Sequence, residues 1–288
     1  MRLADSSRWA GPIRLADGMR LGMTLPTPDP SGESHHPASF GDGARRIEEV
    51  GFHGAWVFDA VNRGFTLPDP LMALAVAAPA TRRLELGTGI LQLGIRNPVE
   101  VAHRVMSAHL VCGDRLTLGV GAGSTAADFH AFGSSYQDRF ARFPDDLEQI
   151  RSLLRGERVG DVDLTPWPST VGGPKMLMGA WAGSAWIHRA AKDFDGWIAS
   201  AAKGGRLAEG IRRFREAGGR RAVVTNIHVE LDGPEEPLQQ DGLFSLRCGP
   251  AEARRRLKWL ESLGFDDAIV RTADHRPENL QLIRELLP

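Results

Sequence analysis

One pattern occurs eight times along this sequence: a short apolar run followed by a longer segment with helical periodicity. Such alternation is typical of βα units around a parallel sheet. The predicted strands are residues 20–25, 54–59, 83–90, 115–121, 175–180, 196–200, 222–229 and 266–271. Joined by right-handed crossovers, these units predict an α/β protein that closes into a (β/α)8 TIM barrel, with an open doubly wound sheet as the alternative.

The predicted barrel is a single domain over residues 19–288. Residues 1–18 carry arginines but no apolar stretch behind them, so we expect a flexible N-terminal extension rather than a secretory signal. The longest apolar run, residues 71–80, is too short to span a bilayer. We therefore expect no membrane-spanning segment.

The charge balance of the chain argues against two classes of partner, nucleic acids and anionic membranes. The chain has 35 Lys and Arg against 36 Asp and Glu, a net charge of -1, and lacks the overall basic field that attracts nucleic acids or anionic membranes. Cys112 and Cys248 are too few for a disulfide framework and suit a reducing cytoplasm, where we expect them as buried small hydrophobes. The nine histidines show no metal-ligand spacing, so no metal site is predicted.

A glycine-rich turn, "GVGAGSTAADF" (119–129), follows the fourth predicted strand and leads into a helix. Backbone N–H groups in such a turn can bind an anion, and Ser124 can cap the helix or donate to a phosphate. The turn lacks the third glycine of a dinucleotide-binding fingerprint. The candidate phosphate-binding residues are Gly121, Ala122, Gly123 and Ser124, with a tight turn that binds nothing as the alternative.

A second turn of small residues, "GAWAGSAW" (179–186), follows the fifth predicted strand. Two such turns on neighbouring strands favour a shared phosphate site. Trp181 is a large aromatic beside it, which either stacks on a ligand or, as we prefer, plugs the barrel mouth. The candidate residues here are Ala180, Trp181, Ala182, Gly183 and Ser184.

Gly87 and Gly89 interrupt the third predicted strand, where glycine costs chain entropy and packs nothing. A glycine inside a strand marks a bulge or a place where something flat approaches the backbone.

Asp59 ends the second predicted strand and is the candidate catalytic carboxylate, with helix capping as its alternative role.

Together, the blocks "GAWVFD", "LELGTGIL", "RNPVEVAHRV", "RLTLGVGAGS", "FHAFGSSYQDRFARFPDDLEQIRSLL" and "DGWIAS" resemble the bacterial luciferase-like flavin monooxygenase superfamily. The resemblance implies a barrel that binds reduced FMN or the deazaflavin F420 at its C-terminal mouth. It also implies that the flat ring packs on a bulge at Gly89-Ile90, with a cis peptide bond there, and that the two small-residue turns hold the phosphate. Many relatives, above all those using F420, carry Asp-His where this chain has Asp59-Ala60.

The resemblance implies a flavin-dependent oxidoreductase, and we expect a monooxygenase that uses reduced FMN and O2 on a small organic substrate. A separate flavin reductase would then supply the reduced flavin, and the early helices would form a homodimer interface. One alternative is F420-dependent hydride transfer, for which Lys203 and Arg206 are candidates to meet the acidic cofactor tail, although we prefer to interpret them as ordinary solvated charges. Another is a non-catalytic flavin-binding relative.

Overall fold

Eight parallel strands close into a barrel in the computed structural model, which describes residues 18–27, 39–238 and 242–287. Closure follows from the pairing of β1 with both β2 and β9 and of β6 with β7. The barrel strands are β1 (Arg20–Thr24), β2 (Gly54–Val57), β3 (Glu85–Gln92), β4 (Leu116–Gly121), β5 (Lys175–Gly179), β6 (Gly196–Ser200), β7 (Ala222–Glu230) and β9 (Asp267–Arg271).

The closed barrel confirms the predicted fold class, and the open-sheet alternative is wrong. All eight predicted strands are present within a few residues of their expected bounds. One short strand was not predicted: β8 (Ser245–Arg247) pairs with the end of β7, where β7 extends beyond the barrel. Of the expected N-terminal extension, residues 1–17 lie outside the described residues.

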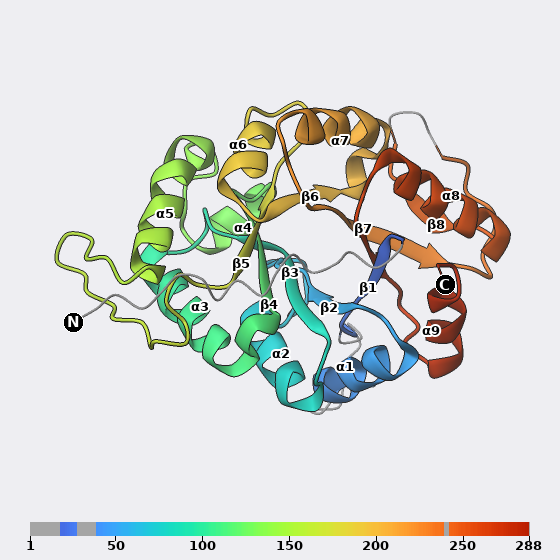
Figure 1. The fold of residues 1–288 in the computed structure, drawn as a ribbon, viewed down its shortest axis with the longest axis horizontal. Coiled ribbons are helices and arrows are strands. Elements are labelled where there is room, and N and C mark those ends of the chain that lie inside the picture. Colours follow the sequence, from blue (N-terminus) through green and yellow to red (C-terminus); the bar gives the residue numbers. More distant parts are fainter. Residues whose placement is uncertain (1–17, 28–38, 239–241, 288) are drawn as a thin grey trace.

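The helices surround the strands (Figure 1). Their bounds are α1 (Ser39–Val50), α2 (Pro70–Ala77), α3 (Pro98–Cys112), α4 (Ala126–Ala131), α5 (Arg139–Leu154), α6 (Trp186–Asp193), α7 (Leu207–Glu216), α8 (Pro250–Leu263) and α9 (Pro277–Arg284). Among the described residues, no helix combines the length and the apolar character needed to cross a membrane.

Local sequence fixes several helix ends. The Asn97 side chain accepts hydrogen bonds from the N–H groups of Val99 and Glu100 and so caps the start of α3. At the end of α8, Gly264 adopts a left-handed conformation with φ of 97°, and the next N–H, of Phe265, donates to Leu260 O. This arrangement satisfies carbonyl groups that the last turn leaves without partners.

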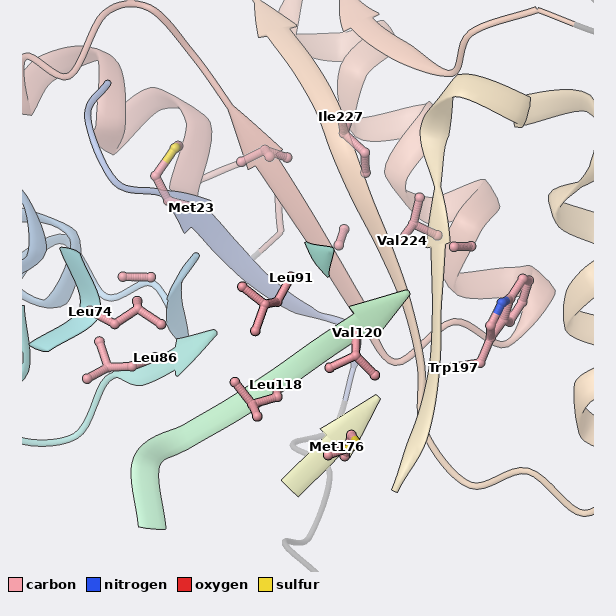
Figure 2. Packing of buried hydrophobic residues seen from close by; sticks show 14 of the residues in the cluster. Met23, Leu74, Leu86, Leu91, Leu118, Val120, Met176, Trp197, Val224 and Ile227 are labelled. Carbon is pink, nitrogen blue, oxygen red and sulfur yellow. The ribbon is translucent and has the colours of Figure 1, made fainter. Parts of the chain in front are cut away.

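The larger hydrophobic core lies between the strands and the helices. Figure 2 shows part of it, with Leu118 and Val120 on β4 and Met176 on the neighbouring strand β5. Residues two apart on a strand share a face, so Leu118 and Val120 both point away from the barrel interior. Burial of these side chains attaches the helices to the outside of the barrel.

A smaller core fills the inside of the barrel around Trp56. Three glycines on β1, β2 and β3 make room for its indole ring. A Cβ added at Gly22, Gly54 or Gly87 would lie 2.8, 2.7 or 2.4 Å from a Trp56 ring atom. Trp56 therefore explains Gly87, the first glycine of the interrupted strand, without any ligand.

Four charged side chains close the N-terminal end of the barrel interior. Glu85 is bonded to Arg221 at 2.8 Å and to Arg20 at 3.2 Å. Asp267 binds the same two arginines, at 2.9 and 2.5 Å. Burial alone would raise the pKa of Glu85, but the charges of Arg221 and Arg20 outweigh it and hold this pKa at about 2. The opposite, C-terminal end of the barrel is therefore the end that is open to a ligand.

Candidate functional site

A cavity of about 500 Å³ opens at the C-terminal ends of the strands. Its walls include Gly89 on β3, Gly121 on β4 and Gly179 on β5, three neighbouring strands. Backbone atoms of these three glycines therefore form part of the cavity wall. The peptide bond between Gly89 and Ile90 is cis, which confirms the expectation for this position.

Ile90 occupies the space that two of these glycines leave open. A Cβ added at Gly121 would lie 2.6 Å from Ile90 Cδ1, and one added at Gly179 would lie 3.0 Å from Ile90 Cγ2. The Ile90 side chain is half-buried and lines the cavity. It gives the cavity an apolar surface between the two turns that follow β4 and β5.

The turn after β4 brings all four of its predicted residues, Gly121, Ala122, Gly123 and Ser124, to the cavity wall. Gly123 has a φ of 93°, a conformation that favours glycine. The prediction that Ser124 caps the following helix is wrong, because α4 begins at Ala126 and its N-cap is Thr125. Ser124 is instead exposed, and its carbonyl oxygen accepts a hydrogen bond of 3.1 Å from the Tyr136 hydroxyl.

The turn after β5 contributes three of its five predicted residues to the cavity, Ala180, Trp181 and Ser184. Ala182 and Gly183 do not line it. A Cβ added at Gly210 would lie 3.0 Å from the Cβ of Ala182, so Ala182 packs toward α7. Trp181 lines the wall and remains 44% exposed, so the expected plug of the barrel mouth is wrong.

Asp59 lies just beyond β2 at the cavity wall and is held by two neighbours. Its carboxylate accepts hydrogen bonds from Arg96 at 2.5 and 2.9 Å and from the backbone N–H of Gln92 at 2.8 Å. The side chains of Asp59 and Arg96 are only 2% and 5% exposed. The helix-capping alternative is wrong, because neither donor belongs to the start of a helix. The contacts show that Asp59 ties the end of β3 to the end of β2.

A second buried carboxylate, Asp128 on α4, continues this network. Arg63 donates to both oxygens of Asp128, and the Gln92 side-chain amide donates to Asp128 Oδ2 at 2.8 Å and to the Asp59 carbonyl at 2.9 Å. Each cavity-wall carboxylate is thus matched by one arginine.

Arg139 adds a positive charge that this pairing does not balance. Its guanidinium lies 3.6 Å from the ring centroid of Tyr136 and 4.0 Å from that of Phe140, and it donates to the Tyr136 carbonyl at 2.6 Å. Its Nε is buried without a hydrogen-bond partner. Within residues 18–27, 39–238 and 242–287, no carboxylate pairs with Arg139. The cavity wall therefore carries a net positive charge close to the turn after β4.

Several cavity residues were missed by the sequence analysis. Gln92 had a visible signal, because it is a polar residue within an apolar run, and Arg139 lies within a block that carried the resemblance.

Lys203 and Arg206 do not line the cavity, and Arg206 pairs with Glu209 at 2.8 Å. No cluster of three or more possible metal ligands occurs in the described part of the chain.

The cysteines are buried and free, as expected. Burial raises the pKa of the Cys112 thiol to about 11 and also raises that of Cys248. Neither residue lines the cavity.

A family model described as luciferase-like monooxygenase matches residues 19–240. Among curated proteins, the chain is 36% identical over 115 residues to 4-hydroxyprotoasukamycin monooxygenase of Streptomyces nodosus subsp. asukaensis, a match that covers 40% of this chain and 31% of that protein. It is 27% identical over 233 residues to the F420-dependent glucose-6-phosphate dehydrogenase of Kineococcus radiotolerans, covering 73% and 68%. The chain thus spans about a third of the length of the first relative.

The fold is also similar to solved structures. One is a type II Baeyer–Villiger monooxygenase in complex with FMN, the oxygenating constituent of 3,6-diketocamphane monooxygenase from the CAM plasmid of Pseudomonas putida. The TM-score is 0.73 at 15% identity, and the match covers 93% of this chain and 97% of that one. At this identity the similarity concerns the fold alone.

Proposed function

The chain belongs to the luciferase-like monooxygenase family, and we propose that it is a flavin-dependent monooxygenase that uses reduced FMN and O2 to oxidise a small organic substrate. The observation that carries this proposal is the cavity at the C-terminal ends of the strands. It joins three features that suit FMN: the Gly89-Ile90 strand backbone, against which a flat ring can pack, a turn of small residues that can bind a phosphate, and an arginine, Arg139, without a paired carboxylate near that turn.

The phosphate would be bound by the turn of Gly121, Ala122, Gly123 and Ser124, with Ser184 on the neighbouring turn and Arg139 as its counter-charge. Successive N–H groups in a turn form an anion-binding concavity. A guanidinium strengthens such a site because a charged donor forms stronger hydrogen bonds to phosphate than a neutral one does. The N-terminus of α4 adds little, since this helix has only six residues.

The ring would lie against the Gly89-Ile90 backbone, with Ile90, Trp181 and Ile198 as apolar surface. When bound in its reduced form, FMN supplies the electrons that activate O2. The protein would orient the substrate and exclude water. For Asp59 we propose a positioning role in place of direct catalysis, because its carboxylate is engaged by Arg96 and by Gln92 N–H at the end of β3.

The groups that line the cavity support FMN over F420. An F420-dependent enzyme that takes hydride from an alcohol needs a base that removes the hydroxyl proton. Among the described residues, no His, Lys, Cys or Glu lines the cavity, and its two carboxylates are both bound to arginine. The hydroxyl of Tyr136, which also lines the cavity, donates to Ser124 O. F420-dependent hydride transfer remains the second candidate, because a relative at 27% identity is named as F420-dependent.

A separate flavin reductase is the proposed source of reduced FMN, because the part of the chain that the structure describes contains the barrel and no second nucleotide-binding unit. The substrate is proposed only by class, as a small organic molecule. Its identity depends on loop side chains for which no transferable code exists.

Fluorescence titration of the purified protein with FMN, F420 and riboflavin tests the proposal. We expect FMN to bind more tightly than F420, and Arg139→Met to weaken FMN binding by about tenfold while leaving the affinity for riboflavin, which has no phosphate, nearly unchanged. Arg142→Met is the matched control, since Arg142 is exposed on the same helix and pairs with Asp146. Tight binding of F420 without FMN binding would favour hydride transfer, and binding of neither would refute a flavin enzyme.

A further inference from the structure

The Thr225 hydroxyl on β7 is a buried polar group without a partner. Thr225 is 4% exposed, and its Oγ1 forms no hydrogen bond. Buried hydroxyl groups in folded proteins nearly always have a hydrogen-bond partner, since an unsatisfied one loses its contacts with water and gains nothing. A partner supplied by a ligand would account for this exception.

Thr225 lines the cavity beside the backbone that we propose for ring binding. A Cβ added at Gly89 would lie 2.8 Å from Thr225 Oγ1. Thr225 pairs with Ser200 on β6, and both residues line the cavity. The hydroxyl therefore faces the interior of the barrel at the level of the cavity.

The backbone next to Thr225 is irregular in a way that enlarges this wall. Between Val224 and Ile227, β7 has one residue more than the facing strand β9. The residue that follows Thr225, Asn226, has a φ of 64° and also lines the cavity. Such a bulge changes the direction of side chains along a strand, and here it gives the β7 wall two polar side chains in succession.

Most other polar side chains of the cavity already bind the protein. Gln92 donates to Asp59 O and Asp128 Oδ2. The hydroxyl oxygens of Ser184 and Ser200 accept hydrogen bonds from nearby backbone N–H groups. Thr225 differs from them because its hydroxyl has neither a donor nor an acceptor in the described chain.

We propose that the Thr225 hydroxyl binds the pyrimidinedione edge of the cofactor ring, the row of carbonyl, N–H and carbonyl groups that flavin and deazaflavin share. This inference rests on the proposed function and adds a ring-recognising residue to it. A hydroxyl both donates and accepts, so it can bind either kind of group on that edge. The proposal holds for FMN and F420 alike.

Thr225→Val tests this directly, because valine has the same shape and lacks the hydroxyl. Removing an unsatisfied buried hydroxyl should leave the ligand-free protein at least as stable in urea unfolding. The same change should weaken the binding of the preferred cofactor about fivefold, the size of one lost hydrogen bond. Thr225→Ser keeps the hydroxyl. Its affinity for the cofactor should therefore lie closer to that of wild type than to that of Thr225→Val.

If FMN is that cofactor, riboflavin locates the contact, because it keeps the ring edge and lacks the phosphate. We expect Thr225→Val to weaken riboflavin and FMN binding by the same factor. A loss for FMN alone would place the contact at the phosphate and overturn the inference, as would equal cofactor affinity of wild type and Thr225→Val. Wild-type protein that binds neither FMN nor F420 would instead refute the proposed function itself.

Discussion

Arg96 and Asp59 form a buried ion pair through two hydrogen bonds, of 2.5 and 2.9 Å, that joins the segment after β3 to the end of β2. Both side chains are almost fully excluded from water. A buried pair is strongly destabilised when one partner alone is removed, since the other charge is left uncompensated. The pair therefore fixes the shape of the cavity wall rather than presenting a free carboxylate.

We predict that Asp59→Asn lowers the free energy of unfolding by about 3 kcal/mol, because the buried Arg96 loses the carboxylate that compensates its charge. Urea unfolding at neutral pH measures this change. Asp42→Asn is the control, since Asp42 pairs with Arg45 on the surface and should change stability by less than about 0.5 kcal/mol. Wild-type stability of Asp59→Asn would show that the carboxylate is not structural and would restore the catalytic interpretation.

Ser124→Asp should weaken FMN binding tenfold or more, about 1.4 kcal/mol, by placing a carboxylate beside the proposed phosphate site. Ser124 is exposed, so the folded protein should tolerate the change. Ser124→Asn, of similar shape without the charge, separates charge from size, and riboflavin should bind all three proteins alike. If Ser124→Asp binds FMN as wild type does, the phosphate lies elsewhere.

Gly87→Ala should lower the free energy of unfolding by about 2 kcal/mol, because the new methyl group would overlap the Trp56 ring inside the barrel. Replacing Trp56 by Phe in the same protein should relieve the overlap, so the two changes together should cost less than their sum. Gly41→Ala is the control, since its nearest neighbour would lie at an ordinary 3.5 Å. Additive effects of Gly87→Ala and Trp56→Phe would contradict the contact.

Acid should destabilise the protein through Glu85. Its pKa is held at about 2 in the folded protein, below the ordinary value of 4.5, so its stabilising effect is complete above pH 4.5 and is lost as the pH falls toward 2. The loss amounts to about 3 kcal/mol. Unfolding curves of Glu85→Gln should therefore show a weaker dependence on pH over that interval, whereas the exposed control Glu216→Gln should follow wild type. Parallel curves for Glu85→Gln and wild type would refute this.

The predicted homodimer remains open to test. Met72 and Val76 on α2 and Leu110 and Val111 on α3 are exposed, and these two helices pack together. Light scattering at micromolar concentration should give twice the chain mass of 31.4 kDa. Met72→Glu should shift the protein toward monomer, whereas Leu282→Glu on α9 should not. A monomeric wild type would mean that this apolar surface is left uncovered.

The sequence by itself determined the order of the barrel strands, the two small-residue turns and the irregularity that glycine introduces into the third strand. The cis peptide bond at Gly89-Ile90 was implied by the family resemblance and is present. The first three features are local: hydrophobic periodicity and glycine placement act over a few neighbouring residues. Phe143, Leu147 and Ile150, for example, already lie on one face of a helix in the sequence pattern, and all three are buried on α5.

Only the tertiary structure decided which residues meet. Barrel closure and strand register bring Asp59 to Arg96 across 37 positions, and Gly89 on β3 to Thr225 on β7 across a far longer separation. The two glycines of β3 look alike in the sequence, but they have different surroundings in the barrel. Gly87 lies against the Trp56 ring, which leaves no room for a side chain, whereas Gly89 lines the cavity. Side chains that share a barrel interior are fixed by strand tilt and stagger, which no local pattern encodes.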